Sequence, residues 1–160
     1  MLTAALDDAL DGRGQMVMLA GEPGIGKTRL AQELADHAQA RGVLVVWGSC
    51  YEGDGAPPYW PWTNAIASFI EPLNSEQLYT IIGSGNTDIA EIVPQIARKR
   101  PDLTKPLDLD LEQARFQLFD SVATFLSNAS KSSPMLIVLE DLHWADHATL
   151  LLLEFVIAAS

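Results

Sequence analysis

The chain reads Gly21-Glu22-Pro23-Gly24-Ile25-Gly26-Lys27-Thr28 directly after an apolar run at residues 16–20 and directly before a helical pattern at residues 29–35. This stretch fills every fixed position of the G-x-x-x-x-G-K-[ST] phosphate loop, with a strand before it and a helix after it, as the motif requires. Glycines let the backbone bend so that consecutive N–H groups point inward toward phosphate oxygens. The stretch therefore predicts a nucleotide-phosphate site in an α/β fold.

The residue types in this loop have distinct chemical roles. A helix that begins near Lys27 presents the positive end of its dipole to a bound phosphate. Lys27 is expected to reach the β- and γ-phosphates, and the Thr28 hydroxyl can ligate Mg²⁺. We expect residues 21–28 to bind the nucleotide together with Arg29, although a residue at that next position is usually a solvated part of the helix.

Composition narrows the class of protein. A length of 160 residues suits one compact domain, and the net charge of −11 argues against a nonspecific nucleic-acid surface on this segment. The single cysteine, Cys50, fits a reducing compartment and is expected to be a buried small residue. The longest apolar run, residues 148–159, is interrupted by Glu154 and is shorter than the ~20 residues that span a bilayer. We expect a cytoplasmic protein with no membrane or direct nucleic-acid contact.

Hydrophobic patterning places the other elements around the loop. Three continuous apolar runs predict strands of a parallel sheet that is buried on both faces, near residues 15–20, 43–48 and 135–140. The strand–loop–helix–strand order at residues 15–48 predicts a right-handed crossover, so these strands should be parallel. Between the second and third strands lies a predicted helical insertion, residues 61–126, with helices over 61–70, 75–82, 88–98 and 111–126 and a proline-punctuated linker over 101–110. Helices are also predicted over 2–10, 27–40 and 147–159.

The third predicted strand ends in two acids, Glu140 and Asp141. In phosphate-loop enzymes, an acid at the end of such a strand lies beside the Mg²⁺ that the loop Thr holds. We expect Glu140 to hold the Mg²⁺ shell and Asp141 to orient or deprotonate the attacking water. By itself, an acid pair after a strand indicates a surface turn. Because the acid pair occurs in the same chain as the Gly21–Thr28 loop, we favour the interpretation that it belongs to the nucleotide site.

The turn after these acids contains further polar and aromatic residues. Asp146 precedes the last predicted helix and is expected to be its N-cap. Trp144 is expected to anchor the turn as an apolar residue. His143 could approach the terminal phosphate or serve a structural role. Arg115 could supply a cation to transferring phosphoryl charge, but nothing in the sequence favours that role.

Several stretches together resemble a known family. They are Leu19–Ala31, which includes the loop, Trp47–Glu52 with Pro58–Trp62, Ala114–Phe119, and Val138–Asp146, which reads Val-Leu-Glu-Asp-Leu-His-Trp-Ala-Asp. The chain resembles the nucleotide-binding domain of the STAND class of signal-transduction ATPases, within the wider AAA-type group. It is most similar to the ATPase module of large ATP-binding LuxR-type transcription regulators and of class III, soluble-type adenylyl cyclases.

The resemblance implies a P-loop NTPase fold, a three-layer parallel sheet with flanking helices, that binds ATP with Mg²⁺. It also implies slow hydrolysis and a regulatory switch role beside output and sensor domains of a multidomain protein. The family's phosphate-binding role falls on Gly21 through Thr28, and its acidic-strand role falls on Glu140 and Asp141. The first acid is commonly Asp in such strands, so Glu140, which is one methylene longer, departs from the pattern at the position that bears on hydrolysis.

Two alternatives to the ATPase switch remain open from the sequence. One is a nucleotide-gated interaction module that binds ATP without hydrolysing it. The other is a small-molecule kinase, which is less favoured because no lid or acceptor site is recognisable between Gly48 and Pro134. The resemblance also implies a further strand between the loop strand and the Glu140 strand. No segment here supplies it, so we expect residues 1–160 to be the N-terminal part of a larger ATPase domain.

Overall fold

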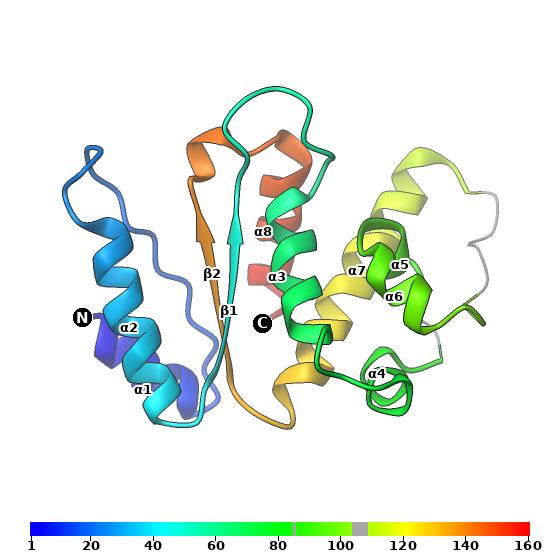
Figure 1. The fold of residues 1–160 in the computed structure, drawn as a ribbon, viewed down its shortest axis with the longest axis horizontal. Coiled ribbons are helices and arrows are strands. Elements are labelled where there is room, and N and C mark those ends of the chain that lie inside the picture. The colour runs from blue at the N-terminus through cyan, green and yellow to red at the C-terminus, as the bar shows by residue number, and fades with distance from the viewer. Residues whose placement is uncertain (85, 104–108) are drawn as a thin grey trace.

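The computed structural model describes residues 1–84, 86–103 and 109–160 (Figure 1). At its centre are two strands, β1 (Leu44–Ser49) and β2 (Met135–Glu140), which pair in parallel. Their register runs from Leu44 opposite Met135 to Ser49 opposite Glu140. The bounds of β2 are those predicted from the sequence, and β1 lies one residue later than the predicted strand.

The strand predicted over residues 15–20 is not formed. Residues 13–20 carry no regular secondary structure, and among the described residues no backbone hydrogen bond joins residues 14–20 to β1 or β2. Three apolar side chains of this run, those of Met16, Val17 and Met18, are 46%, 44% and 65% exposed. A strand exists only where a partner edge accepts its N–H and C=O groups, and in the described residues this run is bonded to neither outer edge of the β1–β2 pair. The described residues therefore contain a two-stranded sheet, smaller than the sheet that was expected.

Helices make up most of the rest of the described chain. They are α1 (Leu2–Leu10), α2 (Lys27–Ala40), α3 (Trp60–Ile70), α4 (Ser75–Ile82), α5 (Ile89–Ile92), α6 (Pro94–Lys99), α7 (Leu111–Ser130) and α8 (His147–Ala159), with a 3₁₀ turn over Leu142–Trp144. No helix in the described ranges is both long and apolar enough to cross a bilayer. Residues 104–108, part of the predicted 101–110 linker, lie outside the described residues, as does residue 85.

Two helices depart from their predicted bounds. The helix predicted over residues 88–98 is broken into α5 and α6 at Val93. Pro94 causes the break, because its ring disfavours helical backbone at the preceding residue. α7 continues past the predicted end at residue 126 to Ser130.

Helices cover both faces of the two-stranded sheet. On one face, α1 and α2 form a small core in which Leu6, Ala38 and Val43 are buried against Val45 and Leu136. On the other face, α3 to α8 form the main core, which includes Met135, Ile137 and Leu139 of β2. Because side chains alternate along a strand, odd-numbered residues of β2 face the main core and even-numbered residues face α2.

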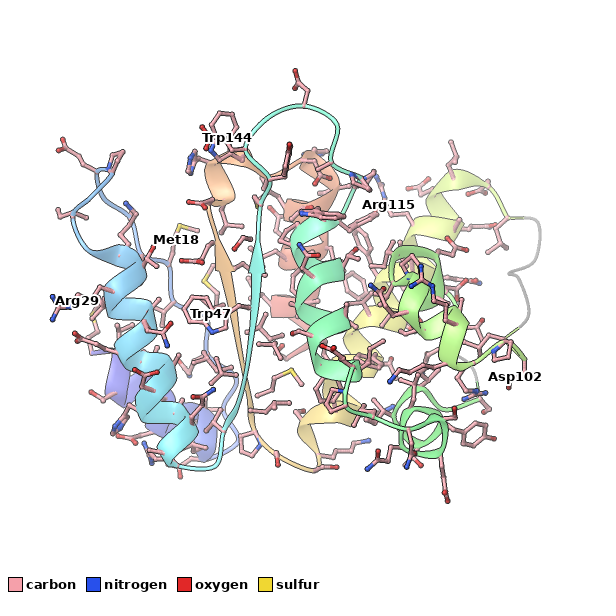
Figure 2. All side chains as sticks on the ribbon, viewed as in Figure 1. Met18, Arg29, Trp47, Asp102, Arg115 and Trp144 are labelled. Atoms are coloured by element: carbon pink, nitrogen blue, oxygen red, sulfur yellow. The ribbon has the colours of Figure 1, made fainter. Side chains whose placement is uncertain are left out.

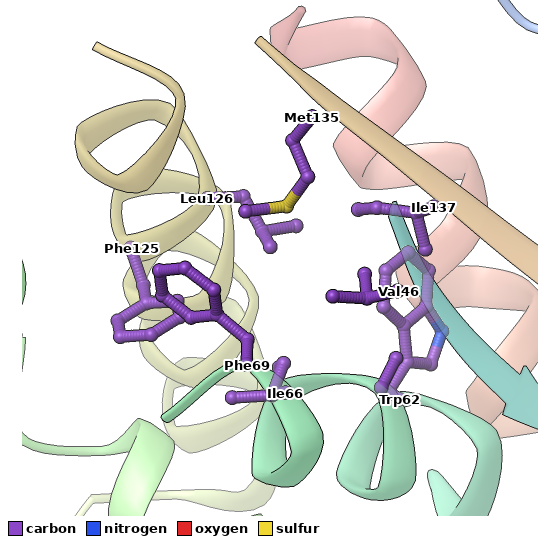
Figure 3. Close-up of a pocket in the computed structure, with 9 residues that line it drawn as sticks. Val46, Trp62, Ile66, Phe69, Phe125, Leu126, Met135 and Ile137 are labelled. Atoms are coloured by element: carbon purple, nitrogen blue, oxygen red, sulfur yellow. The ribbon is translucent and has the colours of Figure 1, made fainter. Parts of the chain in front are cut away.

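An apolar cavity lies inside the main core, between α3, α7 and the strands (Figure 3). Its lining consists of Val46, Trp62, Ala65, Ile66, Phe69, Phe125, Leu126, Met135 and Ile137. No carboxylate, cation or hydroxyl lines it, so the cavity offers nothing that would orient a charged ligand. The candidate functional groups lie instead at the ends of the strands.

Candidate nucleotide-phosphate site

The polar residues singled out by the sequence lie at one edge of the molecule. Figure 1 shows that the loop before α2, the segment after β1 and the turn after β2 share the edge toward which both strands point. In open parallel α/β sheets, ligands bind outside the carboxyl ends of the strands. The fold therefore brings the predicted phosphate loop and the predicted acidic strand end to the edge where a ligand is expected.

Glycine backbone geometry shapes the loop. Gly24 and Gly26 have φ angles of 81° and 102°, in the region that residues with a Cβ rarely adopt. Gly26 is the N-cap of α2 and provides no side chain to cap it. The first N–H groups of α2 thus have no side-chain acceptor from the cap residue and point out of the helix start, where an anion can bind them.

Lys27 closes back over the loop. Its Nζ donates hydrogen bonds to the backbone oxygens of Gly21 at 2.7 Å and of Glu22 at 2.9 Å. The ammonium is therefore held at the loop itself. Thr28, the predicted Mg²⁺ ligand, follows in the first turn of α2 and is exposed. The loop residues lie together as the motif predicts.

Arg29 lies apart from the loop residues. Its Nε pairs with Glu33 Oε1 at 3.2 Å, and its side chain is 86% exposed. Figure 2 shows it pointing outward from α2, away from the strands. Arg29 therefore occupies the solvated helix position that was the alternative prediction for it, and we do not include it in the site.

Glu140 and Asp141 occupy different backbone environments. Glu140 is the last residue of β2, and alternation puts its side chain on the face covered by α2. Asp141 has left-handed backbone, with φ 57° and ψ 38°, which Asp tolerates better than most residues. Its backbone oxygen accepts from the Trp144 N–H at 2.9 Å and so begins the 3₁₀ turn. Glu140 therefore belongs to the strand and Asp141 to the turn that follows it.

Ser49 is a site neighbour that the sequence analysis missed. It is the last residue of β1 and lies opposite Glu140 in the register, with its Oγ 3.5 Å from Glu140 Oε2. The available signal was its position directly after a predicted strand, at the carboxyl edge. That signal could not be used without knowing that the second and third predicted strands are neighbours.

The turn after the acids is built on Asp146. This residue caps α8: its carboxylate accepts from the Thr149 N–H at 3.1 Å and from the Thr149 hydroxyl. Asp146 is thus the N-cap that the sequence predicts. Trp144, the expected apolar anchor of the turn, is 46% exposed. Its ring lies 5.4 Å from that of His143, and Figure 2 shows it at the same edge of the molecule as the loop.

Negative charge accumulates at this edge. Burial raises the pKa of the Cys50 thiol, and the nearby charges of Asp146 and Asp141 raise it further. Burial also raises the pKa of Tyr59, although the cationic Arg115 acts in the opposite direction. The carboxylates of Asp146 and Asp141 therefore lie near enough to Cys50 to act on its thiol, and burial is the larger cause of the shift.

The donor set fits Mg²⁺ bound with a nucleotide. Within the described ranges, no group of three or more His, Cys, Asp or Glu side chains is arranged to hold a metal ion. Mg²⁺ on a nucleotide needs no such cage, because phosphates and water supply most ligands and the protein adds one or two oxygens. The Thr28 hydroxyl and the Glu140 carboxylate are oxygen donors of that kind, from the two segments that reach this edge.

Comparison with known proteins identifies a family. The family model described as AAA ATPase domain matches residues 1–159. No curated protein and no solved structure matches the chain.

Proposed function

The chain belongs to the AAA ATPase domain family, and we propose that it binds ATP with Mg²⁺ and acts as a nucleotide-dependent switch. Membership assigns it nucleotide binding and the P-loop NTPase fold. The observation that carries the proposal is the loop: Lys27 is held over Gly21 and Glu22 at the start of α2, at the edge where β2 presents Glu140 and Asp141.

The residues at this edge would have separate roles in binding and in hydrolysis. The N–H groups of the loop and of the first turn of α2 would bind phosphate oxygens, and Lys27 would move from the backbone oxygens of the loop to the β- and γ-phosphates. Thr28 and Glu140 would hold the metal, which neutralises charge on the phosphates. Asp141 would accept the proton of the attacking water. The switch role, in a larger regulator with output and sensor domains, rests on the resemblance to STAND-class ATPases.

The proposal that the chain hydrolyses ATP, as well as binding it, is tested by Glu140→Gln. The amide keeps the length of the side chain but removes the charge that holds the metal. We expect ATP affinity to change little and phosphate release to fall by about ten- to a hundredfold, the usual cost of disturbing a metal site. Single-turnover phosphate release and equilibrium ATP binding are measured side by side on the same preparations.

The matched control is Glu76→Gln, an exposed glutamate in the first turn of α4. It makes the same chemical change away from the edge and should leave both quantities unchanged. If the wild-type chain binds ATP tightly but releases no phosphate above buffer, the domain is a non-hydrolysing nucleotide-gated module. Equal phosphate release by the wild type and Glu140→Gln would contradict the metal role of Glu140.

A further inference from the structure

We propose that Asp146, Thr149 and Trp62 form a relay that couples the γ-phosphate end of the nucleotide site to helix α3. The inference rests on the proposed function and adds to it a route by which the nucleotide state reaches the helical insertion that begins with α3. It depends on three observations: a closed turn beside the site, a chain of hydrogen bonds that leads from it into the core, and strained backbone near both ends of the chain.

The relay begins at the turn between β2 and α8, whose two ends are Asp141 and Asp146. Asp141 is the proposed acceptor of the proton from the attacking water, which lies beside the γ-phosphate, the group that ATP has and ADP lacks. The Trp144 N–H donates to the Asp141 backbone oxygen at 2.9 Å, and the Ala145 N–H donates to that of Leu142 at 3.0 Å. Because these bonds close the turn, a displacement of Asp141 is passed on to Asp146.

Hydrogen bonds continue the connection from the turn into the core. The Asp146 carboxylate accepts from both the N–H and the hydroxyl of Thr149, whose side chain is fully buried. The backbone oxygen of Thr149 accepts from the indole N–H of Trp62 at 3.2 Å. Trp62 is 1% exposed and belongs to the first turn of α3. Thr149 and Trp62 thus meet where water is excluded, and hydrogen bonds there are electrostatically stronger than in solvent.

Strained backbone lies near both ends of the relay. Tyr59 and Asp141 are the two non-glycine residues with positive φ in the described ranges, at 66° and 57°. Tyr59 is the N-cap of α3, and Asp141 precedes the 3₁₀ turn as its N-cap. Left-handed backbone at residues with a Cβ persists only where the surrounding contacts hold it, and such residues cluster at ligand sites and switch regions. The backbone at both ends is therefore sensitive to a change in those contacts.

Helix α3 connects the relay to the rest of the insertion. Trp62 lies on the wall of the apolar cavity between α3, α7 and the strands, so part of its ring faces empty space (Figure 3). On the same helix, the Thr63 hydroxyl donates to the backbone oxygen of Ile92, the last residue of α5, at 2.7 Å. A shift of the first turn of α3 would therefore reach α5 as well.

The relay predicts that Trp62 responds to the γ-phosphate. The chain has four tryptophans, so labelling them with ¹⁵N gives four indole N–H resonances. Trp47→Phe, Trp60→Phe and Trp144→Phe each remove one resonance, and the one that remains in all three variants belongs to Trp62. With Mg²⁺ present, we expect this resonance to differ in position between saturating AMPPNP, a non-hydrolysable ATP analogue, and saturating ADP. An identical position with the two nucleotides would overturn the relay.

The same coupling is measurable as a ratio of affinities. Coupling between two sites is reciprocal, so loosening the relay must change the preference for AMPPNP over ADP. We expect Trp62→Phe, which removes the indole N–H, to lower this preference about fivefold, the effect of one hydrogen bond, because Asp141 is then less firmly held at the γ-phosphate end. Thr149→Val removes the hydroxyl bonded to Asp146 and should act in the same direction. A purely structural role would weaken the binding of both nucleotides equally and leave their ratio unchanged.

The matched control is Thr63→Val, which removes a hydroxyl from α3 outside the relay and should leave the ratio unchanged. An unchanged ratio in both Trp62→Phe and Thr149→Val, or an equal change in Thr63→Val, would overturn the relay while leaving nucleotide binding intact. If Trp62→Phe does not fold, Thr149→Val and the Trp62 resonance of the wild-type chain decide the question. Failure of the wild-type chain to bind either nucleotide would overturn the proposed function itself.

Discussion

Gly48 shows how a single residue positions the site edge. A Cβ built at Gly48 would lie 2.0 Å from the backbone oxygen of Pro61 and 2.8 Å from its carbonyl carbon. Backbone atoms of α3 thus occupy the space that any other residue would need. The absence of a side chain at Gly48 lets the buried start of α3 lie directly on β1, one residue before Ser49.

We expect Gly48→Ala to destabilise the fold by about 3 kcal/mol, since the obstacle is backbone and an overpacked position must displace the helix. Urea unfolding of the variant and the wild type measures the difference in free energy. Gly14→Ala is the control, because its closest neighbour is the exposed Ser160 side chain and not a helix backbone. Equal stability of the two variants would show that α3 is free to move away from β1.

At the scale of elements, the turn after β2 is tied to two helices. Asp146 caps α8 through Thr149, whose side chain is fully buried. The backbone oxygen of Thr149 in turn accepts from the indole N–H of Trp62 on α3, at 3.2 Å. This chain of contacts joins the acidic turn to the same helix that lies on β1. The position of Glu140 and Asp141 thus depends on α8 and α3 as well as on the strand.

Removing the cap tests this arrangement. Asp146→Ala should cost about 2 kcal/mol of folding free energy, at the upper end for an N-cap, because the buried Thr149 hydroxyl also loses its acceptor. The matched variant is Asp110→Ala, which removes the exposed cap of α7, where the carboxylate accepts from the Gln113 N–H and from no other group in the described part of the chain. We expect a cost of about 1 kcal/mol there. Chemical unfolding checks both, and an equal cost would indicate that the Thr149 hydroxyl contributes nothing.

Elements with a local cause could be predicted from the sequence. The helical spacing of apolar residues predicts α2 and α8, and Asp146 as N-cap follows from its place before an apolar run. Where local chemistry was not weighed, the prediction failed: Pro94 divides the predicted 88–98 helix at Val93. The exposure of Trp144 depends on what surrounds the turn, which its own sequence does not encode.

At the scale of the whole molecule, the sequence did not reveal which of the predicted strands pair with each other. Residues 16–20 have the apolar pattern of a strand as strong as that of β2, yet Met18 is 65% exposed and the run pairs with neither strand. An apolar pattern reports a preference for burial, whereas a strand also needs a neighbouring edge. The same limit hid Ser49, because its proximity to Glu140 exists only once β1 and β2 are known to pair in this register.

The phosphate loop was predictable because its structure is local. Gly24 and Gly26 supply the backbone angles and Lys27 contacts residues only five and six positions earlier. The loop structure ends at Thr28, because the side chain of the next residue, Arg29, pairs along α2 with Glu33. The central claim of the account therefore rests on Lys27.

Calorimetric titration of ATP and Mg²⁺ into the wild type, Lys27→Ala and the surface control Lys131→Ala tests that claim most directly. Lys27→Ala removes the cation that the loop holds for the β- and γ-phosphates, while Lys131 contacts Asn128 at the far end of α7. The account predicts saturable binding by the wild type and Lys131→Ala and a loss of at least about a hundredfold in affinity for Lys27→Ala, the effect of removing a charged partner from a phosphate. ATP affinity in Lys27→Ala equal to that of the wild type would contradict it.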